Sequence, residues 1–196
     1  MTVLYLHGKG GAADESRHYE PLFPESRVVG LDYRTFTPWE TGTEIRAAVK
    51  ALQDEGESVI LIANSIGAFF ALHAGIDTLI EKAYFISPIV DMERLILAMM
   101  QELGVTEDEL KAKGEIETPF GERLSWVYLC YVRSNPVTWN APTAILYGGR
   151  DALTPYETIA AFANKTGACL TVMENGEHWF HTEAQMRFLD QWIKQS

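Results

Sequence analysis

Short apolar runs recur along the chain and predict the strands of a buried sheet. They lie at residues 3–6, 27–31, 58–63, 83–87, 143–147 and 168–173. Most of these runs are continuously apolar and do not alternate with polar positions, which is typical of strands covered on both faces.

Helical patterns separate many of these runs. Residues 45, 48, 49 and 52 follow the i, i+3, i+4, i+7 rule, and similar apolar faces occur at 159–163 and 188–193. Strands that alternate with helices indicate a parallel sheet with helices on both faces. The pattern therefore predicts an α/β three-layer sandwich of about six mostly parallel strands.

One interval breaks this alternation. Between residues 87 and 143, roughly fifty residues contain no convincing strand, which is well beyond the usual length of a connection. Helical stretches are expected at 92–103, 107–113 and 123–132. We predict one domain, residues 1–196, with a helical cap inserted at about 90–140. This cap would cover the carboxyl edge of the sheet, and substrate would enter beneath it.

The run from Val59 to Phe69 carries the strongest chemical signal. Five apolar residues lead into Ser65, which has a small residue two positions before it (Ala63) and another two positions after it (Gly67), and a helical pattern follows at once. A strand, a sharp turn and a helix lift a serine hydroxyl above the sheet edge, as in the nucleophile elbow. The alternative is that Ser65 is only a helix N-cap.

A serine nucleophile needs a base and an acid that orients the base. His178 follows the last predicted strand and precedes the last helix, and Asp151 follows the glycine turn after residues 145–147. We predict His178 as the base and Asp151 as the acid. His181 is the competing base and Asp91 the second choice of acid; Asp151 could otherwise fill only a turn.

The negative charge that develops on the substrate oxygen during the attack also needs hydrogen-bond donors. The backbone N–H groups of Ile66, at the start of the elbow helix, and Lys9, in the glycine-rich turn 8–11, are the expected oxyanion hole. That turn lacks the spacing of a phosphate-binding loop. A metal pair of His178 and His181 has no third ligand at recognisable spacing. No metal or other cofactor is expected.

Together these segments resemble the α/β-hydrolase superfamily over nearly the whole chain. The resemblance rests on His7-Gly8 after the first strand, the segments 63–67 and 148–155, and His178-Trp179-Phe180. It implies a serine hydrolase that forms an acyl-enzyme, most simply from carboxyl esters of small to medium acyl groups. The sequence departs from the family's pattern in two ways: Ala63 stands in place of the usual glycine, and the sheet begins at the family's third strand.

Charge and composition limit the classes of molecule that the protein is expected to bind. A net charge of −11 argues against nucleic acid and against anionic membrane surfaces. No secretory signal or membrane-spanning run is recognised, which favours a cytoplasmic protein.

Cys130 and Cys169 lie in apolar surroundings and are expected to be buried thiols. The expected partner is a small acyl substrate; the oligomeric state stays open. Open alternatives are a peptidase or amidase, a thioesterase, and a non-catalytic binding module on the same scaffold.

Overall fold

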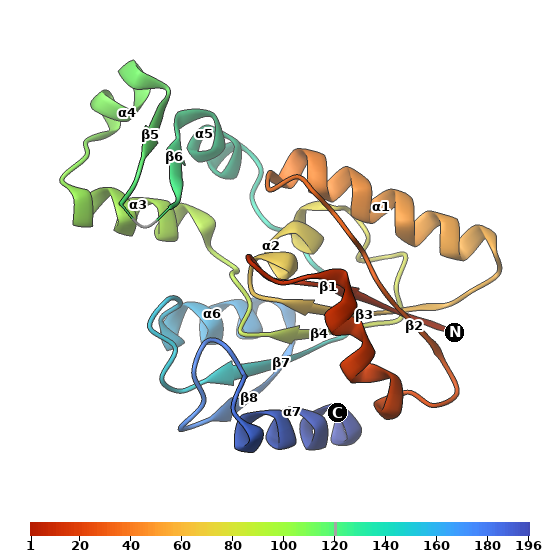
Figure 1. Cartoon of the computed structure of the whole chain (residues 1–196). Helices are drawn as coiled ribbons and strands as arrows, with labels where there is room; N and C mark the ends of the chain where they lie inside the picture. Colours follow the sequence, from red (N-terminus) through yellow and green to blue (C-terminus); the bar gives the residue numbers. More distant parts are fainter. Residues whose placement is uncertain (120) are drawn as a thin grey trace. The chain divides into compact units, whose positions relative to one another are not determined.

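The apolar runs form a sheet of six strands, drawn at the centre of Figure 1. This computed structural model describes residues 1–119 and 121–196. The strand order is β2-β1-β3-β4-β7-β8, and every pairing is parallel. The strands are β1 (Thr2–Leu6), β2 (Arg27–Gly30), β3 (Val59–Asn64), β4 (Lys82–Ile86), β7 (Thr143–Gly148) and β8 (Cys169–Met173). The predicted fold class is confirmed.

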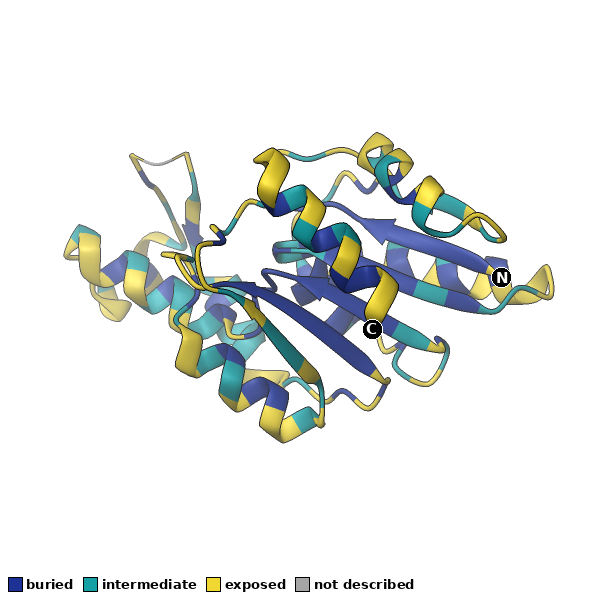
Figure 2. Ribbon diagram, turned by 90° about the horizontal axis from the view of Figure 1, so that it is seen from below, coloured by how far each residue is buried: buried dark blue, intermediate teal, exposed yellow. Residues whose placement is uncertain are grey.

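Helices cover both faces of this sheet. On one face lie α1 (Pro38–Asp54), α2 (Ile66–His73) and α6 (Tyr156–Thr166). On the other lie a 3₁₀-helix, η1 (Ala13–Leu22), and α7 (Glu183–Gln195). Figure 2 shows the central strands largely buried, while the helices expose their outer sides. The strands are apolar throughout because both faces are covered in this way.

The chain direction across the sheet reverses at β1. From β1 the chain moves outward to β2 and then returns across β1 to β3, after which each strand of the sheet is added on the far side. Leu6 at the end of β1 is paired with Ala63 near the end of β3. In open parallel sheets such a switch point leaves a crevice beyond the strand ends, where ligands bind.

The chain divides into two compact units. One unit holds this sheet and comprises Met1–Val90 and Trp139–Ser196, and the other is Asp91–Thr138. The second unit contains α3 (Met92–Leu103), α4 (Glu107–Lys113), β5 (Glu115–Glu117), β6 (Arg123–Ser125) and α5 (Trp126–Ser134). That this segment caps the sheet edge stays a prediction.

The second unit corrects one expectation. The interval expected to lack strands contains the antiparallel hairpin β5–β6, and residues 123–125, expected to be helical, belong to it. Arg123 bridges the two strands at the surface, since its guanidinium lies 2.7 Å from Glu117 and 3.1 Å from Glu115 across the ladder. Three-residue strands are too short to produce a recognisable period, so the pattern concealed them.

Two further findings concern the surface. Among the described residues no helix is both long and apolar enough to cross a membrane. Both cysteines are free thiols, but the expectation that they are buried is wrong: Cys169 is exposed and Cys130 is half-buried. Cys169 begins β8, one of the two edge strands of the sheet, where apolar neighbours in sequence do not guarantee burial.

We predict that His73 makes the protein less stable in mild acid. Burial lowers the pKa of this histidine, at the end of α2, from 6.5 to about 4. The unfolded chain therefore binds a proton that the folded chain does not bind between these pH values. The free energy of unfolding should fall by about 2 kcal/mol as the pH drops through this window, a figure discounted for partial exposure.

Urea unfolding at several pH values tests this. His73→Gln should flatten the acid limb, whereas His181→Gln, at a histidine whose side chain is 62% exposed, should leave its slope unchanged. An unchanged slope in His73→Gln would contradict the prediction.

Candidate active site

Ser65 occupies a strained turn between β3 and α2. Its backbone has φ 53° and ψ −118°, a conformation that residues other than glycine rarely adopt. The residue stands at the N-cap of α2, yet its side chain makes no capping hydrogen bond. The hydroxyl is therefore not used for helix capping, which was the structural alternative. Strain of this kind persists only where the surroundings enforce it.

Backbone hydrogen bonds from the end of β4 hold this turn. The Ser65 N–H donates to the Ile86 carbonyl at 2.9 Å, and the Ile89 N–H donates to the Ser65 carbonyl at 3.1 Å. Between these two partners Ser87 also has a positive φ, of 42°, and is fully buried. The turn at Ser87 thus allows one strand end to bind both backbone groups of the elbow residue.

Gly67 allows α2 to start directly above β1. A Cβ at this position would lie 2.6 Å from the His7 carbonyl oxygen and 2.9 Å from that of Leu6. Real Cβ atoms essentially never come so close to backbone oxygens. A side chain here would therefore push the elbow away from the loop that follows β1.

A continuous hydrogen-bonded line joins the three predicted catalytic side chains. Ser65 Oγ lies 2.8 Å from His178 Nε2, and His178 Nδ1 lies 2.7 Å from Asp151 Oδ2. The three residues are far apart in sequence and come from the ends of β3, β7 and β8. The Asp151 side chain is fully buried in this arrangement, and that of His178 is 12% exposed.

Asp151 is fixed by its second oxygen. Its Oδ1 accepts hydrogen bonds from the backbone N–H groups of Leu153 at 2.8 Å and Thr154 at 3.1 Å. The carboxylate therefore also fills the turn role that was the alternative interpretation. Gly148 admits the His178 loop, because a Cβ there would lie 2.5 Å from the Glu177 carbonyl oxygen.

The competing residues have other contacts. His181 is exposed, and its Nδ1 lies 2.6 Å from the Trp179 carbonyl oxygen. Asp91 caps α3 by accepting from the Arg94 N–H at 2.9 Å. His7 is buried, stacks on Tyr33 at 4.1 Å between ring centroids, and makes a 2.8 Å contact with the Gly8 carbonyl. It therefore orients the loop after β1.

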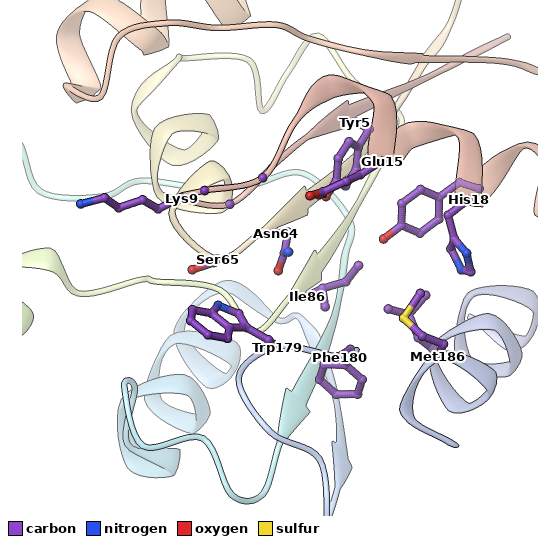
Figure 3. A pocket seen from close by; sticks show the side chains of 15 residues that line it. Tyr5, Lys9, Glu15, His18, Asn64, Ser65, Ile86, Trp179, Phe180 and Met186 are labelled. Carbon is purple, nitrogen blue, oxygen red and sulfur yellow. The ribbon is translucent and has the colours of Figure 1, made fainter. Parts of the chain in front are cut away.

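The two expected oxyanion donors lie on the elements that the sequence indicated. Ile66 is the first residue of α2, so its N–H has no acceptor within the helix. Lys9 lines the same pocket as Ser65, and Figure 3 shows its side chain extending away from the serine. An oxyanion hole made of these two amides stays a prediction.

A pocket of about 530 Å³ opens beside Ser65. This size is within the range of small-molecule sites. It is lined by the glycine-rich turn after β1, by η1, by the ends of β3 and β4, and by the segment from Trp179 into α7 (Figure 3). Within the described ranges, no group of three or more His, Cys, Asp or Glu side chains could hold a metal ion.

The polar wall of this pocket was not predicted. Glu15, His18 and Tyr19 on η1 line it, together with Tyr5 and Asn64. Nothing in the sequence around His18 marked it as a site residue. Its signal was only its position, a few residues after the glycine-rich turn that was expected to face substrate.

Solved structures of other proteins match nearly the whole chain. Est1E from Butyrivibrio proteoclasticus has a TM-score of 0.77 at 20% identity, and the match covers 99% of this chain and 85% of that one. The chain has the α/β-hydrolase fold. Mouse alpha/beta hydrolase domain-containing protein 10 gives a TM-score of 0.75 at 17% identity, covering 99% and 88% of the two chains.

A third α/β-hydrolase neighbour, the monoacylglycerol lipase of Paleococcus ferrophilus, has a TM-score of 0.66 at 17% identity, with 99% and 94% covered. No family model matches the sequence, and no curated protein matches it. At such low identity the likeness establishes the α/β-hydrolase fold and leaves the reaction to be argued from the site.

We predict that Gly67→Ala destabilises the protein, although alanine favours helix more than glycine does. The added Cβ would meet two backbone oxygens, so overpacking should cost about 1–3 kcal/mol. Urea unfolding measures the change. Gly42→Ala is the matched control within α1, because its Cβ would meet its nearest atom at 3.2 Å, and a smaller loss is expected. A gain in stability for Gly67→Ala would contradict this account of the elbow.

Proposed function

We propose that this protein is a serine hydrolase that cleaves carboxyl esters of small to medium acyl groups. The observation that carries the proposal is the line of hydrogen bonds from Ser65 Oγ through the His178 ring to Asp151, at 2.8 and 2.7 Å. A nucleophile within reach of a base, and a base oriented by an acid, is the arrangement that activates a serine.

In the proposed reaction His178 Nε2 removes the Ser65 proton as Oγ attacks the carbonyl carbon of the ester. Asp151 accepts a hydrogen bond from Nδ1–H, which keeps Nε2 available as the base and stabilises the imidazolium. The imidazolium then gives its proton to the leaving alcohol, and an acyl-enzyme remains. Water, activated by the same histidine, releases the acid and restores the serine.

The tetrahedral intermediates carry a negative oxygen, and the amides of Lys9 and Ile66 would stabilise it. Ile66 adds the N-terminal end of α2, where unpaired N–H groups favour negative charge. One such donor is typically worth on the order of a hundred- to a thousand-fold in rate.

Two structural neighbours that are named as lipases or lipase-related proteins support an ester substrate. These are the monoacylglycerol lipase already described and a lipase-esterase related protein from Clostridium acetobutylicum. The same three side chains would also serve a thioesterase, a peptidase or an amidase, because these reactions differ only in the leaving group.

We predict that Ser65→Ala abolishes hydrolysis, since the attacking oxygen is lost. The rate on a nitrophenyl acyl ester should fall by about 10⁶-fold. A fluorophosphonate probe, which reacts with activated serines, should label the wild-type protein and not Ser65→Ala. An aminoacyl anilide measured in parallel should be the poorer wild-type substrate.

The opposite outcomes are equally clear. A wild-type protein that never reacts with the probe and cleaves no ester would favour a binding module. Faster cleavage of the anilide than of the ester would replace the esterase by an amidase.

We predict that Asp151→Asn lowers the rate by about 10³–10⁴-fold, because the amide would favour the wrong histidine tautomer. Ester hydrolysis and probe labelling measure the loss. Asp91→Asn is the matched control: it removes the rival carboxylate, which caps α3, and should leave the rate near that of wild type. Equal activity of Asp151→Asn and wild type would reject Asp151 as the acid.

A further inference from the structure

The pocket beside Ser65 has two chemically different walls (Figure 3). One wall is apolar and comes from the end of β4, the His178 loop and α7. It comprises Ile86, Trp179, Phe180, Met186 and Leu189. The opposite wall is polar and comes from β1, η1 and the end of β3. It comprises Tyr5, Glu15, His18, Tyr19 and Asn64.

Glu15 places an uncompensated carboxylate on the polar wall. Its Oε2 accepts a hydrogen bond from the Tyr5 hydroxyl at 2.5 Å, and its Oε1 accepts from the Ala12 N–H at 3.3 Å. Both partners are neutral, and within residues 1–119 and 121–196 no Lys, Arg or His forms an ion pair with Glu15. The carboxylate is therefore held in one place without neutralisation of its charge.

The residues in contact with Glu15 supply no opposing charge, and the side chain of Lys9, which also lines the pocket, extends away from Ser65 (Figure 3). Burial raises the pKa of Tyr5 and of Tyr19 well above the usual range, and the nearby Glu15 raises both further, so both stay neutral phenols. His18 forms no ion pair with Glu15, and its Nε2 lies 2.7 Å from the carboxylate of Asp190. The polar wall consequently carries a net negative charge.

Tyr19 leaves hydrogen-bonding capacity open in this wall. The residue is only 5% exposed, yet its hydroxyl makes no hydrogen bond to any residue that the structure describes. The Tyr5 and Tyr19 rings lie 5.3 Å apart between centroids beside the carboxylate. Aromatic faces and a carboxylate together are the surroundings that bind ammonium groups in proteins.

We propose that the pocket selects esters that carry an ammonium group on the part of the substrate seated in it, with Glu15 as the residue that determines this specificity. The inference rests on the proposed serine hydrolase function. The ammonium group donates hydrogen bonds to the Glu15 carboxylate beside the two phenol rings, while the carbon chain of the substrate packs on the apolar wall. The protein's net charge of −11 also attracts a cationic substrate.

A neutral hydroxyl on the substrate would fit the same wall less well. It could donate one hydrogen bond to Glu15, but such a bond would leave the charge of the carboxylate without a counterion. Hydrogen bonds that join two charged groups are roughly twice as strong as neutral ones. Amine, hydroxyl and plain alkyl substrates should therefore rank in that order.

The test compares nitrophenyl esters of ω-aminoacyl, ω-hydroxyacyl and alkanoyl groups of equal length, over a series of lengths. A second series carries the same groups on the alcohol side. Glu15 is exposed, so at its best length the amino ester should exceed the alkanoyl ester in kcat/KM by roughly two- to fivefold, on the scale of an exposed charge pair. Glu15→Gln, which keeps the side-chain shape, should reduce this ratio to about one.

Asp14→Asn is the matched control. It removes the same charge one residue earlier in η1, from a side chain that is 79% exposed and outside the pocket. The amino-to-alkanoyl ratio should be unchanged in this variant. A ratio that falls equally in Asp14→Asn and Glu15→Gln would overturn the proposal, because only the overall charge would then matter.

A binding measurement separates this proposal from the proposed function. Calorimetry on Ser65→Ala, with the unreactive amides of the same acyl groups and of the same amino and alkyl substituents on the nitrogen side, reports pocket preference without any hydrolysis. Preferred binding of the ammonium compounds that disappears in Ser65→Ala/Glu15→Gln supports the pocket assignment even if wild type cleaves nothing. No preference for ammonium in rate or binding, or an equal preference for the hydroxyl compounds, overturns it.

Discussion

The strained turn at Ser65 depends on hydrogen bonds from the neighbouring strand. Ser65 N–H binds the Ile86 carbonyl, and the Ser65 carbonyl accepts from Ile89 N–H. Because both bonds come from the end of β4, the elbow exists only when β3 and β4 are paired in their native register, with Asn64 opposite Ile86. The unfavourable backbone conformation is thus maintained by the sheet and not by the local sequence.

The same sheet edge brings His178 and Asp151 to Ser65. Asp151 uses one oxygen for the turn after β7 and the other for His178, so the two ends of the carboxylate fix loop and imidazole together. His178 follows β8, which pairs with β7, and the close approach at Gly148 keeps the two loops in contact. The orientation of the His178 ring therefore comes from the parallel pairing of β7 with β8 and from the tight turns that follow these strands.

Much of this arrangement could be predicted from sequence, because its signals are local. Continuous apolar runs marked the six strands, and the small residues around Ser65 marked the elbow. His178 could be preferred over His181 because it stands nearer the strand, and the structure brings His178, not His181, to Ser65. In each case a short segment carries the information, and the parallel topology then determines which segments meet.

The features that escaped prediction lie in very short or edge strands, or depend on how distant segments pack. The strands of the hairpin β5–β6 have three residues each, too few to show a period, and the ion pairs of Arg123 across them are visible only in the folded chain. Cys169 lies in an apolar sequence but on an edge strand, so burial does not follow. In the sequence nothing distinguishes Glu15 from other acidic residues on a surface helix. Only the folded chain shows that its carboxylate borders the pocket.

The residues proposed for catalysis and the residue proposed for substrate specificity lie on different elements of the fold. The three hydrogen-bonded side chains stand at the ends of β3, β7 and β8, whereas Glu15 lies on η1, between β1 and β2. All of them belong to the same compact unit. The strand ends are constrained by sheet register, whereas η1 lies outside the sheet and is held by packing and by side-chain contacts such as that of His18 with Asp190. The polar residues of η1 make none of the hydrogen bonds in the line from Ser65 to Asp151. A fold that separates the two roles in this way can keep one reaction while the recognised substrate changes.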